Sequence, residues 1–363
     1  MGEFDLIDRF FRQPAAARLA GHAQVTLGIG DDCALLAPRP GLQLAVTSDM
    51  LVAGRHFFAD AEPEALGHKC LAVNLSDLAA MGARPLGFTL ALALPRVEAD
   101  WLQAFSRGML ALADASACPL VGGDTTAGPL TIAITALGEV PAHQALRRDG
   151  ARVGDDIWVS GSPGDARLGL ALRRDELRLP PGHQALADLA CARMDRPTPR
   201  LALGLALSGT LPASRASSGA DADVDPAVPS PSRPPMAQGL AHSAADVSDG
   251  LLADLGHILA ASGVGAEVHA DAVLQPSATW GVLLAQGLVT AEQAHQGVLA
   301  GGDDYELVFT AAPAQAGVLQ TLSHRLGLPL TRIGRITAEV GLRVRDAQGQ
   351  VLTHGFAGFD HFA

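Results

Sequence analysis

The sequence contains a single lysine, Lys69, and its 26 basic residues are outnumbered by 38 acidic ones, which gives a formal net charge of −12. This balance argues against a nucleic-acid groove, because such a groove needs a basic surface to neutralise phosphates. The lysine-bearing phosphate loop G-x-x-x-x-G-K-[ST] is also absent from the sequence. A phosphate-binding site in this chain therefore depends on arginine side chains, backbone N–H groups or metal ions.

Long apolar runs and paired cysteines are missing as well. The sequence contains no run of 18 apolar residues, so it predicts no membrane-spanning helix. The cysteines form no C-x-x-C pair, which disfavours both a zinc site and a disulfide scaffold. The first residues, MGEFDLIDRFF, contain no apolar signal region. We therefore expect a cytoplasmic enzyme with neither a membrane nor a nucleic-acid partner.

The first part of the chain alternates strand-like and helix-like segments. Apolar runs bounded by Gly or Pro predict buried strands over 42–50, 86–94 and 130–140. Helix start and stop signals predict helices over 63–82 and 98–116. This alternation is typical of an α/β domain, which we place at residues 1–150.

A second domain is predicted over residues 151–363. It begins with a strand, a glycine turn and a helix near Asp155, and a further helix is expected within 196–207. Leucine and isoleucine recur at helical spacing between 251 and 259, which predicts an amphipathic helix after the sequence DVSDG. A chain of 363 residues is long enough for two such domains.

The segment 208–244 differs from the rest of the chain in composition. It is rich in Ser, Pro, Ala and Asp and contains no aromatic residue. Such a segment cannot bury enough apolar surface to offset the entropy of ordering. We interpret it as a disordered insertion within the second domain.

Short motifs in both predicted domains place aspartates beside glycine or a small hydroxyl residue. We expect each to lie at a strand end, a turn or a helix start, where such residues are common. Taken singly, the GDD and TSDM motifs are more readily explained as turns or caps. The motifs are GIGDDCALL (28–36), TSDML (47–51), NLSDLAAMG (74–82), GGDTT (122–126), DVSDGL (246–251) and GGDDYEL (301–307).

Asp77 is harder to explain as a structural residue. It lies between Leu75 and Leu78 in an apolar helix, where a buried carboxylate without compensation costs several kcal/mol. The alternative is that Asp77 faces solvent on a polar side of the helix. If the acidic motifs converge, their charges repel one another, and divalent cations remove that conflict. Mg²⁺ prefers oxygen ligands and bridges carboxylates to substrate phosphates, so the set indicates phosphoryl transfer.

The same motifs, in the same order, resemble the bacterial thiamine-monophosphate kinase family of the AIR synthetase superfamily. GGDTT and SDGL occur across that superfamily, whereas the combination of NLSDLAAMG, GGxDYEL and a terminal GFDHF is specific to the kinases. The resemblance covers nearly the whole chain outside 208–244. Its motifs here are GIGDDCALL, TSDMLVAGRHF, KCLAVNLSDLAAMGARP, GGDTT, VSDGLLADLGHI, GGDDYELVFT and GFDHF.

This resemblance implies a two-domain α/β protein of the AIR synthetase-like fold, with an α+β C-terminal domain. The N-terminal sheets of two copies would join in a barrel and form a homodimer, and the active site would lie between domains. ATP would donate its γ-phosphate to thiamine monophosphate, giving thiamine diphosphate and ADP without a phosphoenzyme. Several Mg²⁺ ions would serve as cofactors. Because a phosphate oxygen is already ionised at neutral pH, no catalytic residue is expected beyond the metal and nucleotide ligands.

The resemblance also assigns roles to individual residues. The nucleotide would contact Gly123, Asp124, Arg148 and Ser248, and the acceptor would contact His56, Asp303 and Phe359. From the residues alone, His56 is equally well a surface histidine and Phe359 a terminal core residue. The metal ligands would be Asp32, Thr47, Ser48, Asp49, Asp77, Asp124, Asp246 and Asp249.

Two features depart from the family pattern. Position 303 is usually Glu in the family and is Asp here, so its side chain reaches less far toward the acceptor. The insertion at 208–244 replaces a short connection before DVSDGL. Two alternatives remain open: another ATP-dependent enzyme of the superfamily, and a non-catalytic magnesium-nucleotide-binding module.

Overall fold

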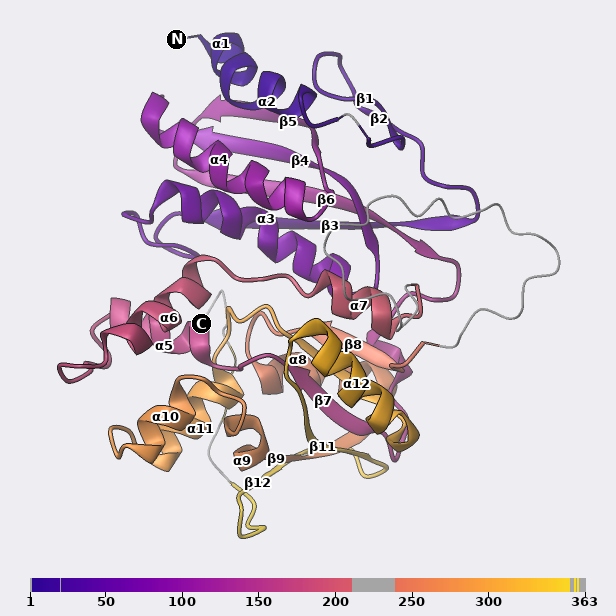
Figure 1. Ribbon diagram of the computed structural model, residues 1–363, viewed down its shortest axis with the longest axis vertical. Coiled ribbons are helices and arrows are strands. Elements are labelled where there is room, and N and C mark those ends of the chain that lie inside the picture. The colour runs from indigo at the N-terminus through magenta and orange to yellow at the C-terminus, as the bar shows by residue number, and fades with distance from the viewer. Residues whose placement is uncertain (1, 20, 211–238, 353–355, 357, 359–363) are drawn as a thin grey trace. The chain divides into compact units, whose positions relative to one another are not determined.

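The computed structural model describes residues 2–19, 21–210, 239–352, 356 and 358 (Figure 1). These residues divide into two compact units. The described part of the first unit comprises 2–19, 21–78 and 83–145, and that of the second comprises 79–82, 146–210 and the described residues from 239 onward. Both units combine helices with a mixed sheet, which agrees with the predicted AIR synthetase-like α/β fold.

The first unit is built on a four-stranded sheet with the strand order β3-β6-β4-β5. β4 and β5 run parallel, whereas β6 is antiparallel to both of its neighbours. The predicted strands correspond to β3 (Leu42–Val52), β4 (Arg84–Leu94) and β6 (Thr131–Pro141). The prediction for GGDTT was wrong, because the motif lies inside a strand, β5 (Leu120–Ala127), and not in a turn.

Residues on β3 alternate between two environments, as the pleat of a strand requires. Ala45, Thr47 and Asp49 are partly buried and Leu51 is fully buried. The residues between them point to the other face, where Val46 is 60% exposed and Met50 59% exposed. The described residues form an open sheet, so the barrel expected from the resemblance is not present in a single chain.

Two long helices, α3 (Pro63–Ala80) and α4 (Ala99–Ala115), lie side by side on one face of this sheet (Figure 1). Both were predicted from the sequence. Their backbones touch where each helix has a glycine: a Cβ on Gly67 would lie 2.0 Å from the carbonyl oxygen of Phe105. α3 is buried around most of its circumference, with Leu71 and Leu75 completely inaccessible.

Smaller elements precede the sheet. α1 (Glu3–Ile7), a π-helical turn η1 (Asp8–Arg12) and α2 (Gln13–Ala16) follow one another and bury Leu6, Phe10 and Phe11. β1 (Val25–Leu27) and β2 (Leu35–Leu36) then pair as a short antiparallel ribbon. The loop between these two strands carries the first acidic motif.

The second unit contains a six-stranded sheet with the order β12-β9-β11-β7-β10-β8. Only β12 and β9 are parallel neighbours in this sheet. The strands are β7 (Asp156–Ser160), β8 (Ser243–Asp246), β9 (Gly265–His269), β10 (Leu307–Ala311), β11 (Leu330–Thr337) and β12 (Gly341–Arg345).

Helices cover both faces of this second sheet. The longest are α5 (Asp165–Arg173), α6 (Gln184–Asp195), α8 (Leu251–Ser262), α11 (Ala291–Ala300) and α12 (Ala316–Leu326). The shorter elements are η2 (Arg148–Gly150), α7 (Leu201–Leu207), α9 (Ala270–Leu274), α10 (Trp280–Ala285) and η3 (Pro313–Gln315). The helix expected within 196–207 begins only at Leu201, after the prolines at 197 and 199.

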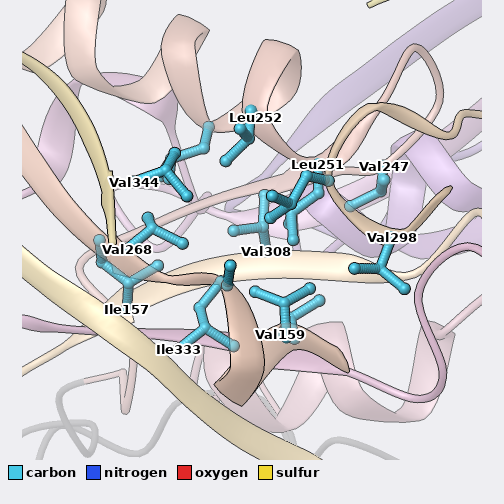
Figure 2. Close-up of a cluster of buried hydrophobic side chains, with 14 of the residues drawn as sticks. Ile157, Val159, Val247, Leu251, Leu252, Val268, Val298, Val308, Ile333 and Val344 are labelled. Atoms are coloured by element: carbon cyan, nitrogen blue, oxygen red, sulfur yellow. The ribbon is translucent and has the colours of Figure 1, made fainter. Parts of the chain in front are cut away.

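Alternate residues of the central strands enter two separate cores. Ile157 and Val159 on β7 pack with α8 and α11 in the core shown in Figure 2, where Leu251 of α8 lies close to Val308 of β10. Trp158, between them in sequence, packs in the opposite core with residues of α7 and α12. The sheet therefore has no solvent-facing side along β7, which explains the continuous burial of that strand.

Most of the segment predicted to be disordered, 211–238, lies outside the described residues, as does Phe359. The two ends of the predicted 208–244 segment are part of the fold. Ser208 is buried, and β8 begins at Ser243. The N–H of Leu240 donates to the carbonyl of Leu207 at 2.7 Å, so the two ends meet. None of the described helices is long and apolar enough to span a bilayer.

Candidate active site

An acidic pair lies between β3 and α3 in the first unit. Thr47 and Asp49 are on the face of β3 that is turned toward α3, and the Thr47 hydroxyl donates a hydrogen bond to Asp77. Asp49 and Asp77 are close enough for their side chains to interact directly. Asp77 is thus held between the strand and the helix and does not lie on an exposed polar side of α3.

Asn74 supports this pair from one turn earlier on α3. Its side-chain oxygen accepts a hydrogen bond from the Asp49 N–H at 3.2 Å. Its amide nitrogen donates to the carbonyl of Cys70 at 3.1 Å. Asn74 is completely buried, so these contacts fix the position of Asp49 relative to the helix. Asn74 was not predicted to be a site residue, although it is the first residue of the NLSD motif.

The electrostatics of the pair favour a bound cation. Burial, together with the charge of Asp77 and a hydrogen bond to it, raises the pKa of Asp49 to about 7. Two carboxylates this close cannot both ionise at low cost unless a positive charge joins them. Carboxylate and hydroxyl oxygens are suitable ligands for Mg²⁺. The donor set of Thr47, Asp49 and Asp77 therefore fits a magnesium ion.

The other metal-ligand candidates of the first unit are not gathered around this pair. Asp32 is exposed in the loop between β1 and β2, where its N–H donates to the side chain of Asp31. Ser48 points to the opposite face of β3 from Thr47 and Asp49 and contacts the hydroxyl of Thr135 at 2.9 Å. Across the described residues, no three His, Cys, Asp or Glu side chains form a ready-made metal cluster.

Gly123 and Asp124 lie on β5, at the opposite edge of the sheet from β3. Two strands separate β5 from β3, which corresponds to roughly 14 Å between the two edges. Gly123 has a φ of 150°. A Cβ at this position would lie 1.9 Å from the carbonyl oxygen of Leu90. Only glycine fits there, and Asp124 follows it as an exposed residue.

His56 belongs to the turn that follows β3. Its Nδ1 accepts a hydrogen bond from the N–H of Val52 at 3.0 Å, so the proton of a neutral ring is on Nε2. The side chain is half-buried. The turn therefore sets the ring orientation of His56.

In the second unit, two of the acidic motifs extend adjacent strands. Asp246 at the end of β8 pairs with Leu307 at the start of β10. Beyond the regular ladder, the N–H of Tyr305 donates to the carbonyl of Val247 at 2.9 Å, and the N–H of Asp303 donates to that of Ser248 at 2.8 Å. The topology thus brings the motifs DVSDG and GGDDYE together, with Ser248, Asp249 and Asp303 half-buried at their ends.

Asp254 fixes the first of these motifs. One oxygen of its carboxylate accepts hydrogen bonds from the N–H groups of Ser248, Asp249 and Gly250 at 3.0, 3.1 and 3.2 Å. Burial and then the charge of Asp249 raise the pKa of Asp254 to about 6, against the lowering effect of the three donors. Sequence reasoning missed this residue, because a single Asp in the first turn of a helix is a common feature.

Asp304 anchors the second motif. Its carboxylate accepts from the N–H of Gly164 at 2.6 Å and from that of Ala166 at 3.1 Å, at the beginning of α5. Arg148, the remaining nucleotide candidate, is exposed on η2, where its carbonyl accepts from the hydroxyl of Ser262 at 2.8 Å.

Both halves of the chain match known family models. Residues 30–140 match the N-terminal domain of AIR synthase related proteins. Residues 230–347 match the C-terminal domain of the same proteins.

Relatives that match over their full length identify one family among the AIR synthase related proteins. The thiamine-monophosphate kinase of Salmonella typhimurium is 42% identical over 100% of this chain and 98% of its own length. A crystal structure of thiamine-monophosphate kinase from Stenotrophomonas maltophilia is 44% identical, covers 97% of this chain and 98% of its own, and has a TM-score of 0.78. A structure described as AaThiL complexed with AMPPCP and TMP is 29% identical, with coverages of 99% and 97% and a TM-score of 0.68. On the family models and these full-length matches, the chain belongs to the thiamine-monophosphate kinase family of AIR synthase related proteins.

Proposed function

We propose that this protein transfers the γ-phosphate of ATP to thiamine monophosphate, producing thiamine diphosphate and ADP. The observation that carries the proposal is the Asp49–Asp77 pair, whose geometry suits a divalent cation, in a chain that belongs to the kinase family. The related structure of AaThiL holds an ATP analogue and TMP, which supports the same pair of substrates here.

Magnesium ions are proposed to neutralise the phosphates of both substrates. Bound Mg²⁺ would supply positive charge for the phosphoryl group during transfer, a role that Lys69 alone cannot fill. Asp49 and Asp77 are the ligands that the geometry supports best. The proposed set also includes Asp32, Thr47, Ser48, Asp124, Asp246 and Asp249.

Residues of both units are proposed to bind the substrates. Gly123, Asp124, Arg148 and Ser248 would contact ATP. His56, Asp303 and Phe359 would contact thiamine monophosphate. The N–H of Asp303 donates to the carbonyl of Ser248, which keeps these two residues next to each other and supports their binding of neighbouring substrates.

The proposed reaction is a direct in-line displacement. An ionised phosphate oxygen of thiamine monophosphate forms a bond to the γ-phosphorus, while the bond from that phosphorus to the β,γ-bridging oxygen breaks and ADP leaves. The attacking oxygen carries no proton at neutral pH, so the chain does not have to supply a general base. Its residues contribute alignment and charge neutralisation, which can lower a barrier by several kcal/mol.

A comparison of acceptors tests this function. With saturating ATP and Mg²⁺, we expect phosphorylation of thiamine monophosphate and only trace phosphorylation of free thiamine, because a hydroxyl acceptor needs a base and offers the metals no anion. Equal or faster phosphorylation of free thiamine would refute the assignment. ATP binding without turnover of either acceptor would favour the non-catalytic module.

We further propose that two copies associate through the exposed face of β3. Leu44, Val46 and Met50 are 47, 60 and 59% exposed on neighbouring positions of that face. Ser48 interrupts this face, but a strand face with several exposed apolar side chains is a common site of association. Light scattering should give about twice the 37.3 kDa chain mass for the wild type and the chain mass for Val46→Glu. Val97→Glu, at another exposed valine of the same unit, should leave the dimer intact.

A further inference from the structure

The segment between α11 and β10 contains two residues in an unfavourable backbone conformation. Asp303 has a φ of 72° and Tyr305 a φ of 52°, both in the left-handed region that residues with a Cβ avoid. Asp303 is the proposed acceptor-binding residue of this segment. Such a conformation persists only where surrounding contacts hold it.

Besides the backbone bonds from Asp303 and Tyr305 to Ser248 and Val247, the segment is held by the two residues that follow the strained ones. Asp304 and Glu306 are buried, whereas Asp303 and Tyr305 are half-buried. Asp304 is held by the N–H groups of Gly164 and Ala166. Asp304 follows Asp303 and Glu306 follows Tyr305, so each strained residue precedes a buried acidic residue.

Glu306 is the centre of a buried ionic network. Arg200, just before α7, donates to both carboxylate oxygens of Glu306, from Nε at 2.7 Å and from a terminal nitrogen. Arg193 on α6 donates to Oε1 at 2.5 Å, and the hydroxyl of Ser160 donates to Oε2 at 2.6 Å. Both carboxylate oxygens are therefore fully engaged by donors from three different elements.

The backbone of Gly161 packs directly against the Glu306 carboxylate. A Cβ on Gly161 would lie 2.0 Å from Oε1 and 2.2 Å from the carboxyl carbon of Glu306. Gly161 itself has a φ of 65°, so glycine is required there for two reasons. Burial acts to raise the pKa of Glu306, but Arg200 and Arg193 lower it overall, so the group stays ionised.

Sheet formation alone does not call for this network. β10 is already paired with β7 on one side and β8 on the other, and its five residues are completely buried. The arginines act one residue before β10, where the regular ladder stops and the left-handed residues begin. The arginines are therefore placed to hold the irregular segment before β10 and not the strand itself.

We propose that Glu306, with Arg193 and Arg200, is a positioning residue that holds Asp303 and Tyr305 in their left-handed conformation and thereby sets the affinity for the acceptor. This inference rests on the proposed function, in which Asp303 contacts thiamine monophosphate. The nucleotide side has a further anchor besides its bond from Asp303, because Asp254 accepts from the N–H groups of Ser248 and Asp249. Loss of the network should therefore weaken acceptor binding and leave ATP binding largely unaffected.

Steady-state kinetics of Glu306→Gln test this split. We expect the KM for thiamine monophosphate to rise by about tenfold, with the KM for ATP within about twofold of wild type. A purely structural role would reduce the active fraction, which lowers the apparent kcat and leaves both KM values unchanged. That result, or an equal rise in both KM values, would overturn the proposal.

Conservative and control variants sharpen the test. Arg200→Met should reproduce the acceptor effect, and Arg200→Lys should restore part of it, because lysine keeps the charge and loses the two-pronged contact. Arg200→Lys also serves if Glu306→Gln does not fold. Glu267→Gln removes an ion pair with Arg345 elsewhere in the same unit and should change neither KM.

Hydrogen exchange separates this inference from the proposed function. The N–H groups of Asp303 and Tyr305 should exchange about tenfold faster in Glu306→Gln than in wild type without any substrate, while that of Phe309 in β10 keeps its rate. If the wild type fails to phosphorylate thiamine monophosphate, the proposed function is wrong. The exchange rates of the two amides would still test whether Glu306 positions Asp303 and Tyr305. Unchanged exchange at both amides would refute it.

Discussion

Two buried acidic sites in this molecule solve the same electrostatic problem in opposite ways. In the first unit, Asp49 lies beside Asp77, and each carboxylate makes it harder for the other to ionise. In the second unit, Glu306 is even more deeply buried, yet Arg193 and Arg200 keep it ionised. Arginines of the chain surround Glu306, whereas Asp49 has another carboxylate as its neighbour, an arrangement that a bound cation would favour.

The difference separates a structural carboxylate from a functional one. A buried charge is tolerated only when it is paired or bound to a metal. Glu306 meets this condition within the folded chain, so its contribution is present before any substrate binds. In the proposed function a bound cation would meet it for Asp49 and Asp77, because the repulsion that raises the pKa of Asp49 would then be relieved.

The most severe test of this contrast is Asp77→Asn. We expect turnover to fall by about a thousandfold or more, because the variant loses a ligand charge in the transition state. The free energy of unfolding without Mg²⁺ should stay the same or rise, since the repulsion with Asp49 is removed. Urea unfolding and a coupled assay measure the two effects. Asp100→Asn, at an exposed position of α4, is the matched control and should change neither. Near-normal turnover of Asp77→Asn would contradict the proposal that Asp77 is a metal ligand.

Glu306→Gln should have the opposite effect on stability. Removing one member of a buried ion pair leaves the arginines without their partner and should lower the free energy of unfolding by about 3–5 kcal/mol. The folded-state pKa of Glu306 lies below its ordinary value of 4.5, so this stabilisation is present above pH 4.5 and is lost as the pH falls through the folded-state pKa. The difference in unfolding free energy between wild type and variant should therefore shrink on acidification below that value. A difference that grows in acid would contradict the ionised pair.

Mg²⁺ should stabilise the folded protein through the Asp49–Asp77 site and should not affect the Glu306 network. Mg²⁺ at about one hundred times its dissociation constant should stabilise the wild type by about 2.7 kcal/mol, because it binds only the folded chain. Glu306→Gln should gain a similar amount if it retains the first-unit site, whereas Asp77→Asn should gain little. Thermal unfolding in a magnesium titration measures this, and sodium chloride at matched ionic strength is the control. Equal stabilisation of all three proteins would show that Mg²⁺ acts elsewhere.

Removal of residues 211–238 should have the smallest effect. Their composition does not support a packed core, and the flanking backbone is already joined by the hydrogen bond from Leu240 to Leu207. A chain in which Thr210 connects to Gly239 should therefore retain kcat and both KM values within about twofold of wild type. A folded deletion variant with a large loss of activity would assign the segment to the catalytic apparatus.

The local features of this protein could be predicted from its sequence. The apolar runs that became β3, β4 and β6 carry enough β-propensity and flanking turn signals to be recognised, and α3 and α4 have clear start and stop residues. Each acidic motif is a short continuous stretch of sequence, so the motifs and their order along the chain were sufficient to identify the family. β5 was missed because Gly122–Thr126 has the composition of a turn, and only pairing with β4 makes it a strand.

Tertiary structure decided which of these residues act together. Thr47, Ser48 and Asp49 are consecutive, but the pleat of β3 turns Ser48 to the opposite face, and α3 brings Asp77 to the other two. Arg200 and Arg193 stand more than one hundred residues before Glu306, at separations of 106 and 113, with no motif that marks them as its partners. Sequence records local propensity and residue chemistry, whereas the balance of a buried charge depends on groups that only the packed chain brings within a few ångströms.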